Sequence, residues 1–309
     1  KKSDVKIDFT PEQVREYIKC AKDPIHFIKS YVKIINVDLG LIPFSMWEFQ
    51  EDMVLTAVQE RFVVAKMPRQ VGKTTTVASL ILWQILFNEN YNVAILANKE
   101  RQAREILSRI QLAYEHLPRW MQQGIVEWNK GNLELENGSK VLASSTTSSA
   151  IRGGSFNLVY LDEFAFVPTN IQEDFFASVY PTISSGKTTK VLITSTPNGL
   201  NMFYKLWVDS EENRNSYKRV DVHWSQIPGR DEEWKAETIK NTSEEQFRQE
   251  FECEFLGSSN TLISPNVLRR MVFRTPIDSS EEGLKIYSAP IQDRLYTLVA
   301  DTSRAKGLD

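Results

Sequence analysis

The sequence predicts an α/β protein in which a parallel sheet is flanked by helices, and three observations lead to this class. A short apolar run at 62–65 enters a loop that ends in Gly72-Lys73-Thr74, and a helical pattern follows. A second strand-like run, at 92–97, precedes a long amphipathic pattern, and a third, at 158–161, ends in two adjacent acids. Strands that alternate with helices at this spacing are typical of parallel α/β sheets.

The composition is that of a globular protein. The 309 residues are enough for one large domain or two ordinary ones, with 41% hydrophobic and 25% charged residues. The net charge of -3 gives no overall basic character, so any contact with nucleic acid requires a local patch or an oligomer. The two cysteines, Cys20 and Cys253, provide neither a disulfide framework nor a metal-binding spacing.

No apolar run is long enough to cross a bilayer, and the N-terminus lacks the apolar core of a signal peptide. These features fit a cytoplasmic, reducing environment. Because the chain does not start with Met, we expect a fragment of a longer protein.

Residues 1–40 are predicted to be helical, with a capped helix start at Thr10-Pro11-Glu12-Gln13. Further on, Trp47 and Gln50 stand shortly before the loop. An aromatic residue followed by a glutamine in this position can pack on adenine and read its amino edge. The alternative is an ordinary helix with Trp47 in the core.

The segment 62–75 has the strand–loop–helix context of a phosphate-binding loop. In such a loop, backbone N–H groups face the β- and γ-phosphates, Lys73 adds a positive charge, and the Thr74 hydroxyl ligates Mg²⁺. The usual pattern has Gly where this chain has Met67. A surface turn with a solvated lysine is the alternative.

Residues 125–145 are rich in β-forming residues, and Asn137-Gly138 predicts a hairpin there. Asp162 and Glu163 follow the buried run at the carboxyl end of the sheet, the edge where ligands bind in open α/β folds. Asp162 would hold Mg²⁺, directly or through water, opposite Thr74, and Glu163 would act as the general base on the attacking water. Two acids in a solvated turn are the alternative, which the upstream Gly-Lys-Thr disfavours.

A further strand at 190–193 ends in Thr194-Ser195-Thr196, whose hydroxyls can sense the γ-phosphate beside the phosphate site. The alternative is a plain strand-to-turn connection, for which Pro197-Asn198-Gly199 supplies the turn residues. Residues 201–257 are predicted to be mostly helical.

Together these segments resemble the large terminase subunit of tailed bacteriophages, in particular the T-even-like group. The resemblance rests on Arg69–Thr75, Leu158–Glu163, Thr194–Gly199 and Phe251–Gly257, and it covers nearly the whole chain. It implies a packaging motor in which a P-loop NTPase domain of the ASCE, RecA/helicase-like type hydrolyses ATP with Mg²⁺ and drives double-stranded DNA into a procapsid.

The resemblance also implies a domain organisation: an ATPase domain at 1–257 (nucleotide-binding core 41–214, small helical lid subdomain 1–40 and 215–257), a linker at 258–294, and the truncated start of a nuclease domain at 295–309. Asp301 matches the first metal-binding acid of that nuclease. Because a two-metal nuclease needs several carboxylates, we expect the full-length protein, but not this fragment, to cut DNA.

By the same resemblance, Arg69 is a cis arginine finger that acts with Lys73 and Glu163 in catalysis. Thr194, Ser195 and Thr196 match the coupling motif. The implied ATP-binding residues are Gln50, Arg69, Gln70, Val71, Gly72, Lys73, Thr74 and Thr75.

The implied partners are double-stranded DNA, the portal protein of the procapsid, the small terminase subunit and further copies of the chain in a ring, expected to be a pentamer. No membrane is involved, and the setting is the host cell cytoplasm. Two alternatives stay open: a helicase-like DNA-dependent ATPase unrelated to packaging, and an inactive nucleotide-binding or docking module. The second is disfavoured by the intact Lys73, Thr74, Asp162 and Glu163.

Overall fold

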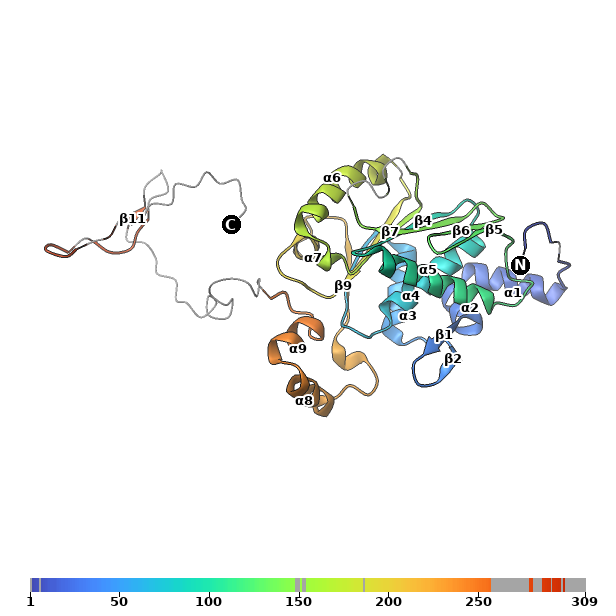
Figure 1. Cartoon of the computed structure of the whole chain (residues 1–309), viewed down its shortest axis with the longest axis horizontal. Coiled ribbons are helices and arrows are strands. Elements are labelled where there is room, and N and C mark those ends of the chain that lie inside the picture. The colour runs from blue at the N-terminus through green and yellow to red at the C-terminus, as the bar shows by residue number, and fades with distance from the viewer. Residues whose placement is uncertain are drawn as a thin grey trace. The chain divides into compact units, whose positions relative to one another are not determined.

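The computed structural model describes residues 2–5, 7–147, 151, 154–185, 187–256, 278–279, 285–289, 291–295 and 297 (Figure 1). The chain divides into two compact units, 1–260 and 261–309. In the second unit, two short antiparallel strands are described, β11 (Asp278–Ser279) and β12 (Lys285–Ile286). Of the predicted site residues, Asp301 lies outside the described residues, and the others lie in the first unit.

A mostly parallel sheet forms the centre of the first unit. Its described strands are β3 (Phe62–Lys66), β4 (Asn92–Ala97), β5 (Ile125–Trp128), β6 (Asn132–Leu135), β7 (Lys140–Ser145), β8 (Leu158–Asp162), β9 (Lys190–Ser195) and β10 (Lys218–Asp221). Their order is β10-β3-β9-β8-β4-β7-β6-β5, with parallel neighbours from β10 to β7 and an antiparallel edge formed by β6 and β5. The predicted α/β class is therefore confirmed.

Helices cover both faces of this sheet. They are α1 (Pro11–Lys22), α2 (Pro24–Tyr31), α3 (Glu48–Gln59), α4 (Lys73–Phe87), α5 (Glu100–Glu115), α6 (Thr169–Ser185), α7 (Met202–Glu211), α8 (Glu232–Asn241) and α9 (Glu244–Glu250), with short 3-10 turns η1 (Phe164–Phe166) and η2 (Trp224–Gln226). The first helix begins with the predicted capping box, in which Thr10 and Gln13 exchange hydrogen bonds. Helices α4 and α5 lie side by side on one face, and α6 and α7 belong to the other (Figure 1).

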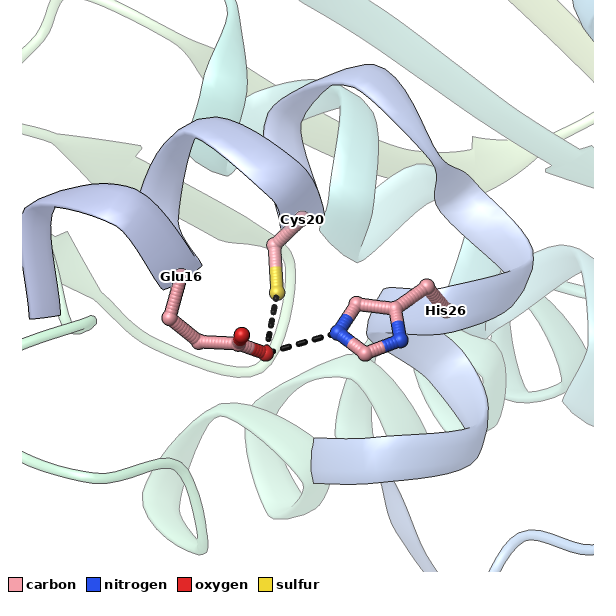
Figure 2. Close-up of side chains that lie close together, drawn as sticks. All are labelled: Glu16, Cys20 and His26. Atoms are coloured by element: carbon pink, nitrogen blue, oxygen red, sulfur yellow. Dashed lines mark hydrogen bonds and ion pairs between the residues drawn. The ribbon is translucent and has the colours of Figure 1, made fainter. Parts of the chain in front are cut away.

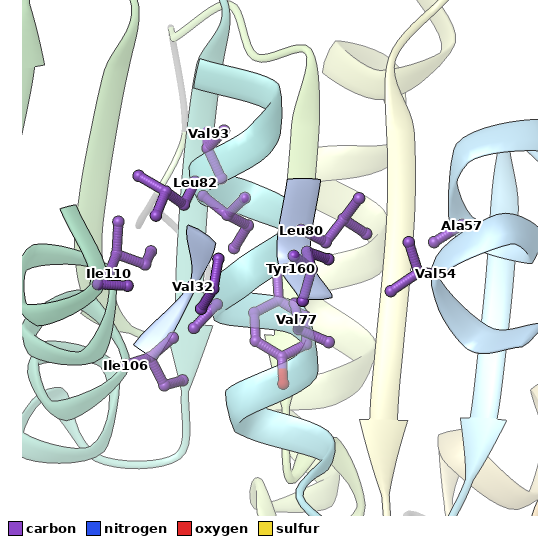
Figure 3. Packing of buried hydrophobic residues seen from close by; sticks show 14 of the residues in the cluster. Val32, Val54, Ala57, Val77, Leu80, Leu82, Val93, Ile106, Ile110 and Tyr160 are labelled. Atoms are coloured by element: carbon purple, nitrogen blue, oxygen red, sulfur yellow. The ribbon is translucent and has the colours of Figure 1, made fainter. Parts of the chain in front are cut away.

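The buried side chains form two clusters because successive residues of a strand point to opposite faces of the sheet. In β8, Tyr160 joins the cluster that includes α4 and α5, where it lies near Val77 and Leu80 (Figure 3). Its neighbours Val159 and Leu161 join the other cluster, with residues of α6 and α7. Burial on both faces explains why the central strands read as continuous apolar runs.

The parallel register brings the carboxyl ends of the central strands to one level. Asp162 of β8 pairs with Ala97 of β4 on one side and with Thr194 of β9 on the other. Lys66, the last residue of β3, pairs with Ser195. The loops that leave these strands therefore start from the same edge of the sheet.

The structure differs from the sequence-based prediction in two short stretches. The predicted helical segment 1–40 ends in a hairpin, β1 (Lys33–Asn36) with β2 (Gly40–Pro43), and β10 lies inside the segment predicted to be helical. All three strands have four residues, and β10 exists because it pairs with β3, which is distant in the sequence. Helix α4 begins at Lys73, directly after Gly72, whose φ of +71° ends the loop.

The burial of β9 makes a stability prediction. Ile193 is fully buried in this central strand, so Ile193→Ala leaves a cavity and should lower the free energy of unfolding by about 2–5 kcal/mol. The matched control is Ile35→Ala in β1, where the side chain is 65% exposed and the change should stay within about 0.5 kcal/mol. Urea unfolding measures both, and equal losses would contradict this arrangement of the core.

Candidate functional site

The loop between β3 and α4 is anchored at two buried apolar side chains, Met67 and Val71. The Met67 N–H donates to the carbonyl oxygen of Ser195, which ties the start of the loop to β9. Gln70 (φ +58°) and Gly72 (φ +71°) take left-handed conformations. A Cβ atom on Gly72 would come within 2.7 Å of the Gln50 amide nitrogen, so both conformation and space require glycine here.

Backbone donors of this loop are left free. Within the described part of the chain, the N–H groups of Gln70, Val71 and Gly72 make no hydrogen bond. The first N–H groups of a helix, here those of α4, have no partner inside the helix either. Free N–H groups that converge at a helix N-terminus form an anion-binding site.

A cavity of about 520 Å³ lies at the loop. Its lining residues come from the loop, the N-termini of α4 and α5, and the segment after β8: Arg69, Gln70, Val71, Gly72, Lys73, Thr74, Thr75, Asn98, Lys99, Gln102, Arg109, Glu163 and Phe166. The structure therefore brings together most of the residues that the sequence predicted for ATP binding. Its size is that of a small-molecule pocket.

Lys73 and Glu163 form an ion pair in this cavity, with 2.5 Å between Nζ and Oε1. The lysine side chain is only 8% exposed and the carboxylate 25%. Glu163 has a left-handed backbone (φ +49°), an uncommon conformation for a non-glycine residue that costs of order 1 kcal/mol and often marks a functional site. This backbone conformation directs the Glu163 side chain from the end of β8 toward Lys73.

Asp162 lies beside this pair but is buried. Its Oδ1 accepts hydrogen bonds from the Tyr160 hydroxyl (2.7 Å) and the Thr194 hydroxyl (2.9 Å), which are themselves 3.0 Å apart. No described residue donates to Oδ2. Burial raises the pKa of Asp162, and the nearby Glu163 charge raises it further, against the opposing effect of Lys73.

Tyr160 was not singled out by the sequence, although its hydroxyl holds two predicted site residues, Asp162 and Thr194, in one network. The available signal was a single polar atom within the apolar run 158–161. Burial and the neighbouring Asp162 raise the pKa of Tyr160, so its hydroxyl stays a proton donor.

Arg69 is paired with α9. Its Nε lies 2.6 Å from Oε2 of Glu250, and its N–H donates to the Glu250 carbonyl oxygen at 3.0 Å. The guanidinium, 55% exposed, also lies 6.0 Å from the centre of the Phe166 ring. No local sequence pattern identifies Glu250 as a partner, because 181 residues separate it from Arg69.

Gln50 supports the loop from beneath. Its Oε1 accepts from the Trp47 N–H, and its Nε2 donates to the carbonyl oxygen of Val71 at 2.9 Å. The side chain is buried and does not line the cavity. The structure thus places Gln50 next to the loop, and its contact with adenine stays a prediction.

Among the predicted coupling residues, Thr194, Ser195 and Thr196 are all fully buried. Thr194 binds Asp162, and the Ser195 hydroxyl accepts from the Ala165 N–H. The Thr196 hydroxyl has no hydrogen-bond partner among the described residues. The first two therefore connect β9 to the acidic end of β8.

Arg109 of α5 is a second residue that the sequence did not predict. Its Nη1 donates to the hydroxyl of Thr75 at 2.8 Å, and its side chain lines the cavity. It adds a positive charge to a wall that already has Arg69, Lys73 and Lys99. A wall of this charge favours a polyanionic ligand.

A cluster of metal-ligand types lies elsewhere, at the corner of α1 and α2 (Figure 2). Oε1 of Glu16 accepts hydrogen bonds from the His26 ring (2.6 Å) and the Tyr31 hydroxyl (3.1 Å), with the Cys20 thiol at 3.7 Å. Since one carboxylate oxygen satisfies all three groups, the cluster is explained as a hydrogen-bonded joint between two helices.

In the described ranges, no helix is long and apolar enough to span a membrane.

Comparison with known proteins assigns this chain, rather than individual site residues, to a family. The profile described as "Terminase large subunit, T4likevirus-type, N-terminal" matches residues 65–270. The chain is 26% identical over 233 residues to the "Terminase, large subunit" of Thermus virus P23-45, covering 65% of this chain and 47% of that protein. It spans about half the length of the curated relatives it matches first.

Two solved structures share the fold. The large terminase ATPase domain of Thermus phage P74-26 superposes with a TM-score of 0.56 at 22% identity, covering 69% of this chain and 95% of that one. The large terminase of bacteriophage HK97 gives a TM-score of 0.65 at 18% identity, covering 83% and 60%. At these identities the likeness concerns the fold.

The raised pKa of Asp162 makes a stability prediction. A buried carboxyl whose pKa is raised by folding destabilises the native state increasingly as pH rises above its usual pKa, and fully above the raised pKa, because the charge must then be held in the interior. Asp162→Asn removes the charge and keeps an acceptor for Tyr160 and Thr194. Near neutral pH it should raise the Tm by about 2–4 °C, and the gain should shrink as pH falls toward the usual pKa of aspartate.

Differential scanning calorimetry, from neutral pH down toward the usual pKa of aspartate, measures whether Asp162→Asn raises or lowers the Tm. The matched control is Asp209→Asn, since Asp209 is only partly buried and forms an ion pair with Arg214. That change should leave the Tm unchanged or lower it. A Tm of Asp162→Asn at or below that of the wild-type protein would show that the buried charge has no cost.

Proposed function

Because this chain belongs to the T4-like family of terminase large subunits, whose N-terminal part it matches, we propose that it is the ATP-hydrolysing motor domain of a viral large terminase. In this function it drives double-stranded DNA into a procapsid. The observation that carries the proposal is the Lys73–Glu163 pair in a cavity lined by a loop with free N–H groups. Family membership disfavours a helicase-like ATPase unrelated to packaging.

The triphosphate binds at the loop in this proposal. The N–H groups of Gln70, Val71 and Gly72, with the N-terminus of α4, provide donors for phosphate oxygens. Lys73 exchanges the carboxylate of Glu163 for a phosphate oxygen, and Arg109, which donates to the Thr75 hydroxyl, adds a further positive charge to the wall. The Glu163 carboxylate therefore occupies, on Lys73, the position that a phosphate oxygen takes when the nucleotide binds.

Glu163 is the general base. Once Lys73 turns to the phosphate, the carboxylate is free to accept a hydrogen bond from water and to take its proton during attack on the γ-phosphate. Its strained backbone holds it within reach of the loop. The Ser195 hydroxyl, 3.5 Å from its second oxygen, limits its rotation.

The proposed Mg²⁺ ligands are the Thr74 hydroxyl and the Asp162 carboxylate. The donor set fits this ion, since Mg²⁺ prefers oxygen ligands and Oδ2 of Asp162 accepts no hydrogen bond from the described residues. When bound, the ion would neutralise charge on the phosphates. The hydrogen bonds from Tyr160 and Thr194 fix the orientation of the carboxylate.

Arg69 is the proposed arginine finger in cis. Only its Nε is bound to Glu250, and the exposed guanidinium lines the cavity, so a change of rotamer can bring it to the γ-phosphate. Thr194 and Ser195 are proposed to couple phosphate release to movement, because they bind the acids at the end of β8.

The wider assignments follow from the family. We propose double-stranded DNA, the portal protein and the small terminase subunit as partners, a homo-oligomeric ring on the portal as the working assembly, and the host cytoplasm as its place. Nuclease activity, with Asp301 as one metal ligand, is proposed for the full-length protein. Gln50 is proposed to contact adenine through its second amide hydrogen.

The catalytic assignment is tested by Glu163→Gln, which keeps the size and polarity of the side chain. We expect ATP affinity to stay within about threefold of wild type while turnover falls at least about 100-fold, because the proton acceptor is lost. Lys73→Ala should abolish both binding and hydrolysis. Fluorescent-nucleotide titration and phosphate release with Mg²⁺ measure the two quantities.

The matched control is Glu12→Gln, which removes an exposed carboxylate that is also ion-paired, with Arg15, far from the cavity. It should change neither quantity. Near-normal turnover in Glu163→Gln would exclude Glu163 as the base, and normal ATP affinity in Lys73→Ala would exclude the cavity as the phosphate site.

A further inference from the structure

Arg230 contacts the backbone of the loop between β3 and α4 and does not line the cavity. It stands between η2 and α8, and its guanidinium carbon lies 4.7 Å from the centre of the Trp234 ring and 5.5 Å from that of Phe251. From this position Nη2 donates to the carbonyl oxygen of Arg69 at 3.1 Å and reaches that of Gln70 at 3.4 Å. The aromatic rings orient the guanidinium, and the loop carbonyls receive its protons.

The planarity of the peptide bond gives these contacts a consequence. In a trans peptide, the C=O of one residue and the N–H of the next point in opposite directions. Fixing the carbonyl of Arg69 therefore fixes the N–H of Gln70, and fixing the carbonyl of Gln70 fixes the N–H of Val71. These two N–H groups have no partner within the described part of the chain, and both residues line the cavity.

The charge of Arg230 is not neutralised locally. No carboxylate among the described residues forms an ion pair with it, and its Nη1 is buried without a hydrogen-bond partner. Burying half of an arginine without an acidic partner is costly, and here the two loop carbonyls and the two aromatic rings offset part of that cost. Here its positive charge lies against the back of a loop whose front receives phosphates.

The segment from η2 to α9, which contains Arg230, contacts the site at two further points. Glu250 of α9 holds Arg69, and Gln249 donates to the carbonyl oxygen of Pro197, in the loop that follows β9. Those contacts act on a side chain and on a neighbouring loop. Among the described residues, Arg230 is the side chain of this segment that acts on the carbonyls of the phosphate-binding loop.

We propose that Arg230 is a positioning residue that aims the N–H groups of Gln70 and Val71 at the bound phosphates. The inference rests on the proposed nucleotide function, but the orientation of the loop N–H groups by Arg230 can be tested without a nucleotide. Arg230 does not line the cavity, and it acts through the backbone of Arg69 and Gln70.

The test compares Arg230→Met with Arg230→Lys. Met keeps the apolar stem against Trp234 and Phe251 and removes every donor, whereas Lys keeps the charge on a side chain that is one bond shorter than the path to Nη2. The control is Arg219→Met, since Arg219 also lies over a tryptophan, Trp207, but binds Glu211 instead of the loop.

The first readout uses no nucleotide. The amide ¹⁵N shift of a residue depends on the hydrogen bond to the preceding carbonyl, so Arg230→Met should displace the signals of Gln70 and Val71. Arg230→Lys should displace at least one of them, and Arg219→Met neither. Unmoved signals in both Arg230 variants would overturn the proposal, whether or not the protein binds nucleotide.

The second readout is the affinity for Mg-ADP, which reports phosphate binding without hydrolysis. Arg230→Met should weaken it about 10-fold and Arg230→Lys about threefold, since two hydrogen bonds from a charged donor orient the loop. Arg219→Met should bind as wild type does. If Arg230→Met loses the signals of α8 and is unfolded there, Arg230→Lys decides, and wild-type signals and affinity in that variant overturn the proposal. Wild-type protein that binds no nucleotide would instead overturn the proposed function.

Discussion

The pairing of Lys73 with Glu163 is the interaction on which the site depends, because it joins the phosphate-binding loop to the acidic end of β8. Lys73 follows strand β3 and Glu163 follows strand β8, and β9 lies between these two strands in the sheet. They meet because parallel strands bring their carboxyl ends to one edge, and because a left-handed Glu163 turns its side chain toward the loop. The fold thus supplies the placement, and one strained residue supplies the contact.

The buried Asp162 beside this pair lowers the stability of the fold but is positioned to bind a cation. Asp162 is held by Tyr160 and Thr194 in the interior, where burial raises its pKa. A hydrogen-bonded carboxylate with one open oxygen is costly without a cation and well prepared for one. The same logic applies to Arg230, whose charge has no acidic partner among the described residues.

The sequence could predict whatever depends on local pattern. The central strands are apolar runs, and Gly72-Lys73-Thr74 and Asp162-Glu163 stand where strands end, so the α/β class and the core of the site followed directly. Relations across long sequence distances could not be predicted. Glu250 holds Arg69 from 181 residues away, and β10 is a strand only because it pairs with β3. Arg109 and Arg230 were missed for the same reason, since only the folded chain shows what they bind. Tyr160 was missed because its hydroxyl is a single polar atom within an apolar run.

The decisive measurement is a structure of the protein with a non-hydrolysable ATP analogue and Mg²⁺. We expect the β- and γ-phosphates on the N–H groups of residues 70–73, Lys73 moved from Glu163 to a phosphate oxygen, and Asp162 and Thr74 facing the same ion. A triphosphate bound elsewhere, or a Lys73–Glu163 pair that stays intact with the nucleotide in place, would contradict it.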